Sequence, residues 1–174
     1  KTTLFEYLIE QALKNYKDLT AFSFDSFNGM TIFTDYLQGY NIDFQDISFN
    51  PFQIDLTDQE NYDFAVNLLK MMTGISNTES LKKIVDALAL LPIEDRILAN
   101  EKGISYPEQG PIYEALSDWV DGSYKKYFNA REDKFNLDNR FVNFQMNAII
   151  KDEKLSAPII YCIMHKIYQK CKEG

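Results

Sequence analysis

The sequence is poor in the residues that bind metal ions or form disulfides, with two cysteines and one histidine among 174 residues. Cys162 and Cys171 fall in one predicted helix, where their spacing puts them about 13 Å apart along the axis, so they cannot pair. So few cysteines favour a reduced compartment. His165 has no cysteine or histidine partner at the spacing of metal ligands, and we interpret it as a structural or surface residue.

Basic residues and long apolar segments are also scarce. Lys and Arg number 18 against 26 Asp and Glu, a net charge of −8. This balance argues against a broad basic face, and we expect no direct binding of nucleic acid. No apolar run approaches the roughly 20 residues of a membrane-spanning helix, and no secretory leader is visible, so a soluble chain is expected. With 45% hydrophobic residues, the chain can bury one sizeable core.

The first 56 residues alternate between helix and strand patterns. Apolar spacing predicts a helix over 1–16, and "LTAFSFD" predicts a short buried strand that ends at Asp25. A second helix is predicted over 30–37, closed by Gly39 in a left-handed conformation. "YNIDFQDISFNPF" then predicts an edge strand and a turn at Asn50-Pro51. This alternation predicts an α/β fold with a parallel sheet, and residues 1–56 form its first part.

Residues 57–121 have the pattern of an all-helical insertion. Capping-box patterns at Thr57 with Glu60, and at Ser76 with Glu79, each precede an apolar stripe of helical spacing. A shorter helix is predicted over 93–100 and another over 112–120. The loop between them carries Gly103, Pro107 and the Gly110-Pro111 pair.

Residues 122–174 form a polar and aromatic connector and then return to the α/β core. "RFVNFQM" predicts a strand with alternating faces, and 157–172 predicts a closing helix with a broad apolar face. The whole chain is therefore predicted to be a single α/β domain with a helical insertion.

Lys1 and Thr2 stand directly before the first predicted helix. In phosphate-binding loops of the form G-x-x-x-x-G-K-[ST], this pair ends the loop and begins the helix behind it. The lysine reaches the β- and γ-phosphates, the hydroxyl binds Mg²⁺, and the free N–H groups at the helix start favour the anion. Lys-Thr before a helix is common and the glycines of such a loop are absent from the sequence, so on this pair alone an ordinary helix start is the preferred interpretation.

Several other residues have a functional and a structural interpretation. Asp25, at a strand end, is placed to bind metal-held water or a neighbouring subunit, but a carboxylate that caps the following turn is preferred. An aromatic group could stack on bases, yet without positive charge around it we predict core packing; its members are Trp119, Tyr124, Tyr127 and Phe128. The acidic pairs lie beside lysine or arginine and are interpreted as solvated faces; they are Glu94-Asp95, Glu132-Asp133 and Asp152-Glu153.

An ordered set of stretches extends along the chain: "KTTLFEYLIEQAL", "AFSFDSFNG", "SFNPFQI", "LSDWVDGSYKKYFN" with "FNLDNRFVNFQMNAI", and "SAPIIYCIMHKIY". In order and spacing this set resembles the C-terminal motor domain of the type IV secretion and conjugal transfer ATPases, the VirB-four-type or TraC-like family, over nearly all 174 residues. The most specific parts are the Phe-Asp strand end followed by Gly29, the turn Phe49-Asn50-Pro51-Phe52, the connector with Trp119 and Gly122, and "VNFQM" followed by a helix that Pro158 initiates.

The resemblance implies a RecA-like P-loop NTPase fold that hydrolyses ATP with Mg²⁺, as a homo-oligomer, a ring or a dimer. It also implies partners in a type IV secretion apparatus and a cytoplasmic location, peripheral at the bacterial inner membrane. Lys1 would contact phosphate as the catalytic lysine, Thr2 would contact Mg²⁺, and Thr3 would complete the nucleotide-binding stretch. The glycines of the loop and a later strand ending in Asp-Glu would lie outside the sequence, so we expect these 174 residues alone to be inactive and to hold no nucleotide tightly.

The sequence departs from the family after Asp25, where Ser26, Phe27 and Asn28 replace a run that is often charged. No arginine finger can be placed among Arg96, Arg131 and Arg140. Two alternatives remain: a DNA-translocating or coupling ATPase of the same P-loop group, which the acidic charge disfavours, and a non-enzymatic module whose helical insertion binds partner proteins.

Overall fold

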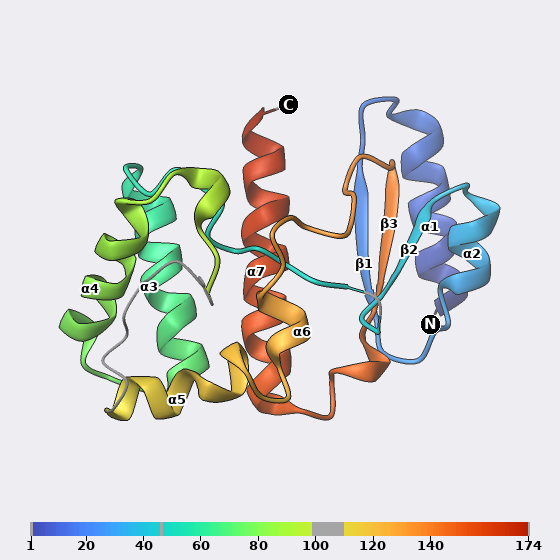
Figure 1. Ribbon diagram of the computed structural model, residues 1–174. Helices are drawn as coiled ribbons and strands as arrows, with labels where there is room; N and C mark the ends of the chain where they lie inside the picture. Colours follow the sequence, from blue (N-terminus) through green and yellow to red (C-terminus); the bar gives the residue numbers. More distant parts are fainter. Residues whose placement is uncertain (1, 46, 99–109, 174) are drawn as a thin grey trace. The chain divides into compact units, whose positions relative to one another are not determined.

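Figure 1 shows the computed structural model of the chain, which describes residues 2–45, 47–98 and 110–173. Within these residues the chain forms seven α-helices and one three-stranded parallel sheet. The predicted mixed α/β class with a parallel sheet is therefore confirmed. Two compact units are present: the first comprises Lys1–Ile47 and Phe135–Asp152, the second Ser48–Lys134 and Glu153–Gly174.

The first unit contains the sheet. The strand order is β1-β3-β2, and both pairings are parallel. The predicted elements of residues 1–45 and the predicted strand near 141–146 are present. Their bounds, with that of a short 3-10 turn, are α1 (Thr2–Asn15), β1 (Ala21–Asp25), α2 (Thr31–Tyr36), β2 (Tyr40–Asp43), β3 (Phe141–Gln145) and η2 (Met146–Ala148).

Both helices of the first unit cover one face of the sheet (Figure 1). Leu13 of α1, Met30 before α2 and Phe141 of β3 form a buried apolar cluster there, and Ile9 and Phe33 pack against it. The central strand β3 is buried at Phe141, Val142, Asn143 and Phe144, that is, on both of the alternating faces that the sequence predicted.

The end of α2 differs from the prediction in one respect. The residue in the left-handed region is Gln38, with φ 55°, and not Gly39. The N–H of Gly39 donates to Thr34 O at 2.8 Å and the N–H of Gln38 to Asp35 O at 3.0 Å, which is the Schellman arrangement. Gly39 is needed for another reason: a Cβ atom there would lie 2.6 Å from Phe141 O.

The second unit is helical. Within it, α3 packs against α4, α5 and α7. The predicted boundary between 57–121 and 122–174 is not a boundary of this unit, because α7 belongs to the same compact unit as the other helices. The elements are α3 (Gln59–Thr73), α4 (Thr78–Ala89), a 3-10 turn η1 (Ile93–Asp95), α5 (Pro111–Val120), α6 (Lys125–Phe128) and α7 (Glu153–Glu173).

Three predicted helix starts in this unit were misplaced. The N-caps of α3 and α4 are Asp58 and Asn77, each one residue after the predicted cap, and their side chains accept from the N–H groups of Asn61 and Glu79. Asp and Asn are at least as good caps as the Thr and Ser before them, so the sequence alone could not separate the positions. The helix α7 begins at Glu153, and Pro158 lies inside it instead of starting it.

The helix predicted over 93–100 is only the short turn η1, and residues 99 and 100 lie outside the described residues, as does the loop carrying Gly103 and Pro107. The chain leaves this turn at Arg96, which is 7% exposed. Its guanidinium donates to three backbone carbonyls, at 2.7 to 3.2 Å; these belong to Ile54, Ala89 and Leu91. The backbone of Arg96 is extended, with φ −80° and ψ 95°, where the turn ends.

The aromatic group of the connector packs in the core of this unit, as predicted. Trp119 is fully buried, its ring centroid lies 4.7 Å from that of Tyr124 and 5.2 Å from that of Phe128, and its indole N–H donates to Met72 O at 3.0 Å. Within the described part of the chain, no helix has the length and apolar character needed to cross a membrane.

Asn50 ties three segments of the second unit together. Its side-chain amide donates to Arg96 O at 2.9 Å and to Arg131 O at 3.2 Å, and its Oδ1 accepts from Phe52 N at 3.1 Å. Its backbone N–H donates to Asp133 Oδ1 at 2.8 Å, and Lys166 of α7 pairs with the same carboxylate. Asp133 and its neighbour Glu132 are both exposed, as predicted for a solvated acidic pair, and the Asp133 carboxylate is in addition a structural anchor.

Candidate functional site

The predicted nucleotide-binding residues lie at the start of α1. Thr2 and Thr3 are exposed in its first turn, which has no acidic residue, while Lys1 lies outside the described residues. Because α1 runs antiparallel to the strand that follows it, this helix start is at the carboxyl end of the sheet (Figure 1). Ligands of parallel α/β sheets gather at this edge.

Polar side chains end all three strands at the same edge. Asp25 of β1 and Asp43 of β2 are both in register with Gln145 of the central strand. The amide of Gln145 donates to Thr31 Oγ1 at 3.0 Å, which joins the end of β3 to the start of α2. Asp25, Gln145 and Asp43 therefore lie in a row along the carboxyl edge of the sheet, the edge at which α1 and α2 begin.

Asp25 holds the turn between β1 and α2. One carboxylate oxygen accepts from Phe27 N at 3.1 Å and the other from Met30 N at 2.8 Å. Both oxygens are thus engaged by the backbone, and the preferred interpretation of Asp25 as a turn-capping carboxylate is confirmed. The turn includes Asn28 in the left-handed region, with φ 57°.

The turn that Asp25 holds reaches the start of α1. A Cβ atom placed on Gly29 would meet the methyl group of Thr2 at 3.9 Å, an ordinary contact. Thr2 and Gly29 are therefore neighbours although 27 positions separate them in the sequence. Thr2 and Gly29 each belong to a motif of the sequence, but no sequence pattern showed that the two residues would lie close together.

The start of α1 has the donor types that a phosphate and Mg²⁺ would need, but only in part. Exposed helix N–H groups attract anions, and the Thr2 hydroxyl is a hard oxygen ligand of the kind that Mg²⁺ takes. The backbone cradle of a glycine-rich loop is not formed by the described residues. Among those residues, no group of three or more His, Cys, Asp or Glu is placed to hold a metal ion.

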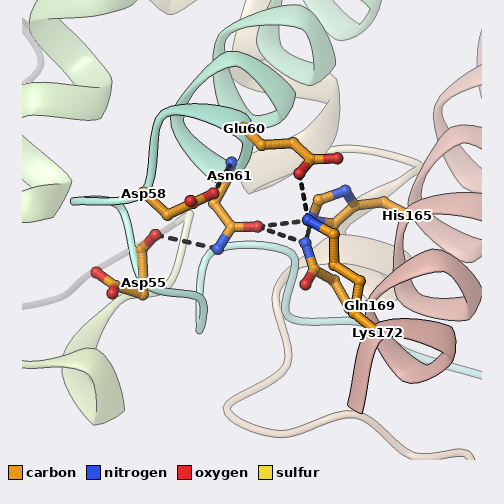
Figure 2. Close-up of polar contacts among 7 residues, drawn as sticks. All are labelled: Asp55, Asp58, Glu60, Asn61, His165, Gln169 and Lys172. Carbon is orange, nitrogen blue, oxygen red and sulfur yellow. Dashed lines mark hydrogen bonds and ion pairs between the residues drawn. The ribbon is translucent and has the colours of Figure 1, made fainter. Parts of the chain in front are cut away.

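A second polar cluster, in the helical unit, was not predicted. Figure 2 shows it between the start of α3 and the C-terminal half of α7. Asn61 is its centre: Oδ1 contacts His165 Nε2 at 3.1 Å and accepts from Gln169 Nε2 at 2.8 Å, and Nδ2 donates to Asp55 O at 3.1 Å. At its rim Lys172 pairs with Glu60.

The prediction for His165 itself is confirmed, since the ring is a structural part of this cluster. It stacks on Phe64, with centroids 3.7 Å apart and planes 7° from parallel. The hydrogen bond from Lys172 lowers the pKa of Glu60, which favours the ion pair at neutral pH. Only a spacing of four between His165 and Gln169 on one helix could have suggested the cluster, and nothing in the sequence pointed to Asn61 as their partner.

In comparisons with known proteins, no protein-family model and no curated protein matches the chain.

Proposed function

We propose that residues 1–174 are part of the ATP-hydrolysing motor of a bacterial type IV secretion or conjugation system, which energises assembly or substrate transfer. The observation that carries this proposal is the position of the Thr2–Thr3 helix start, at the carboxyl end of a parallel sheet and beside the turn after β1. A phosphate-binding helix has this position in P-loop folds. The ordered resemblance along the chain supports the same conclusion.

In this proposal the fold is RecA-like, and the helical unit includes the insertion. Lys1 would bind the phosphates of ATP, Thr2 would bind Mg²⁺ through its hydroxyl, and Thr3 would add to the nucleotide-binding stretch. The bound metal neutralises charge that develops on the phosphates. Catalysis by these residues would rest on positioning and charge stabilisation, because phosphoryl transfer needs little covalent chemistry from the protein.

The turn beside Thr2 has a supporting part in this proposal. Asp25 holds it through two backbone N–H groups, so the turn that carries Gly29 is held close to Thr2. The motor would act as a homo-oligomer with other subunits of the secretion apparatus, on the cytoplasmic side of the inner membrane and peripheral to it.

The test is ATP hydrolysis and Mg·ATP binding by the full-length protein, compared with its Lys1→Ala, Thr2→Ala and Lys17→Ala variants. Lys1→Ala is expected to lose most turnover, because the ammonium that binds the phosphates is removed. Thr2→Ala is expected to need more Mg²⁺ for the same rate. Lys17, exposed beyond the opposite end of α1, is the matched control and should retain activity.

Equal turnover in the wild type and Lys1→Ala would contradict the assignment of the phosphate site. If the wild type neither binds nor hydrolyses ATP, the motor proposal fails. The chain would then be better explained as an interaction module.

A further inference from the structure

The first half of α1 has an exposed apolar flank, formed by Leu4, Phe5 and Leu8. Their side chains are 63%, 61% and 52% exposed, whereas Leu13 of the same helix is buried against the sheet. About half of the apolar stripe of α1 is therefore left without cover by the residues that the structure describes.

The charged side chains in the described part of α1 all lie on its other flank, toward α2. Glu6, Glu10 and Lys14 follow one another at intervals of four residues, and Glu10 accepts from the hydroxyl of Tyr36 in α2 at 3.0 Å. At about 100° per residue, the three members of the apolar flank lie about 120° to 160° around the helix axis from Glu10. The apolar flank thus faces away from α2 and carries no charge, as is typical of a surface that another element covers.

The apolar flank extends beyond the outer edge of β1. Both helices lie on one face of the sheet (Figure 1), where α2 packs on β2 and β3, and α1 packs near Ala21 of β1. Three strands span about 14 Å, and two helices side by side span about 20 Å, so the helix layer is wider than the sheet by about one strand spacing. Since α2 lies over the β2 side, the excess width lies beyond β1.

The outer edge of β1 has unpaired backbone groups. Ala21 N donates to Arg140 O at 2.8 Å, toward β3. Alternate residues of a strand direct their N–H and C=O groups to opposite edges, so those of Phe22 and Phe24 point away from β3. Within the described part of the chain β1 pairs with β3 alone, and β1 lacks the lysine or proline that often protects a free edge.

We propose that the outer edge of β1 pairs with a fourth strand, which the apolar flank of α1 covers. This strand is an extended segment with apolar side chains on both faces, because one face meets the apolar flank and the other lies beside Phe22 and Phe24. For the source of the segment the proposal rests on the proposed function, in which the full-length protein extends beyond residues 1–174. The edge of β2 is a poorer site, since β2 is one residue shorter and carries Asp43.

Hydrogen exchange of the β1 amides tests the strand pairing, in the full-length protein and in residues 1–174 alone. The N–H groups of Phe22 and Phe24 should exchange at least about tenfold more slowly in the full-length protein, because the fourth strand accepts from them there. Ser23 is the internal control, since its N–H faces β3 and should be protected in both. The measurement needs no ATP, so it is independent of the phosphate site.

A substitution on the apolar flank tests the cover by α1. Leu8→Glu should lower the Tm of the full-length protein by several degrees, because it places a charge against the fourth strand. The same substitution should leave the Tm of residues 1–174 nearly unchanged, since Leu8 is exposed there. Ile32→Glu is the matched control: Ile32 is an apolar residue of α2, 84% exposed and away from β1, and its replacement should change neither Tm.

Equal exchange of Phe22 and Phe24 in the two proteins would overturn the proposal, as would equal effects of Leu8→Glu and Ile32→Glu on the full-length protein. If residues 1–174 self-associate and this alone protects the two amides, the occupant is a second copy and the assignment is wrong. Protection of both amides in a full-length protein that does not bind ATP would support the fourth strand while the motor proposal fails.

Discussion

Asn50 is expected to be the most sensitive polar residue of the helical unit. Replacing it with Ala removes two bonds to the carbonyls of Arg96 and Arg131 and one from the N–H of Phe52. Each such bond contributes about 1 kcal/mol net, so the loss is about 3 kcal/mol of the free energy of unfolding. The true value is expected at or above this figure, because Asn50 is 1% exposed and water cannot replace its side chain.

The assay is urea unfolding followed by the fluorescence of Trp119, the one tryptophan of the chain, which lies in the same unit. Gln59→Ala is the matched control, because its side-chain amide also donates a hydrogen bond, but to the Asp63 carboxylate in solvent. The control should change the free energy by less than about 0.5 kcal/mol.

A second variant, Asn50→Asp, tests whether the donor function matters. Aspartate has the same shape and still accepts from Phe52 N, but it places a carboxylate against two carbonyl oxygens, so it should cost at least as much as Ala at neutral pH. If Asn50→Ala lowers stability by less than about 1 kcal/mol, or if Asp is tolerated, the hydrogen bonds do not hold this unit together as argued.

Two further predictions concern other contacts. Gly39→Ala should destabilise the protein by about 2 kcal/mol in thermal or urea unfolding, because the new Cβ lies 2.6 Å from Phe141 O. The control Gly29→Ala makes only a 3.9 Å contact and should be nearly neutral. Equal effects of the two substitutions would refute this steric reasoning. Burial, together with the hydrogen bond to Asp86, raises the pKa of Tyr62 to about 12, so an alkaline absorbance titration should show late tyrosine absorbance that Tyr62→Phe reduces by one tyrosine. The stability that Tyr62 provides is fully present below pH 10 and is lost as pH rises toward 12, and a titration curve unchanged in the variant would disprove the assignment.

Local sequence patterns predicted the elements, because periodicity is a local property. The stripe of α1, the short strand before Asp25 and the strand at "RFVNFQM" all occur where predicted. Helix ends were less certain, since neighbouring residues such as Thr57 and Asp58 are both good caps and only the folded backbone selects one. The position of Gly39 was predicted for the wrong reason, because its close approach to β3 depends on a strand about 100 residues later.

Contacts between distant segments could not be predicted. No sequence signal showed that β3 would lie between β1 and β2, or that α7 would join the unit of the other helices. Asn50 and Arg96 are polar residues that sequence rules place on the surface, yet both are buried because backbone carbonyls surround their donors. At the candidate site, the sequence predicted Thr2 and Asp25 but not the turn that brings Gly29 to Thr2.

The central place of β3 has a consequence for synthesis of the protein on the ribosome. The strands β1 and β2 emerge early but share no hydrogen bonds with each other, and contacts such as Ser23 with Asn143 span 120 positions. The nascent chain must therefore complete most of the helical segments before its sheet can close, and closure over so long a loop is slow. Until then both early strands expose unpaired edges, which makes this interval the one in which a chaperone would matter most.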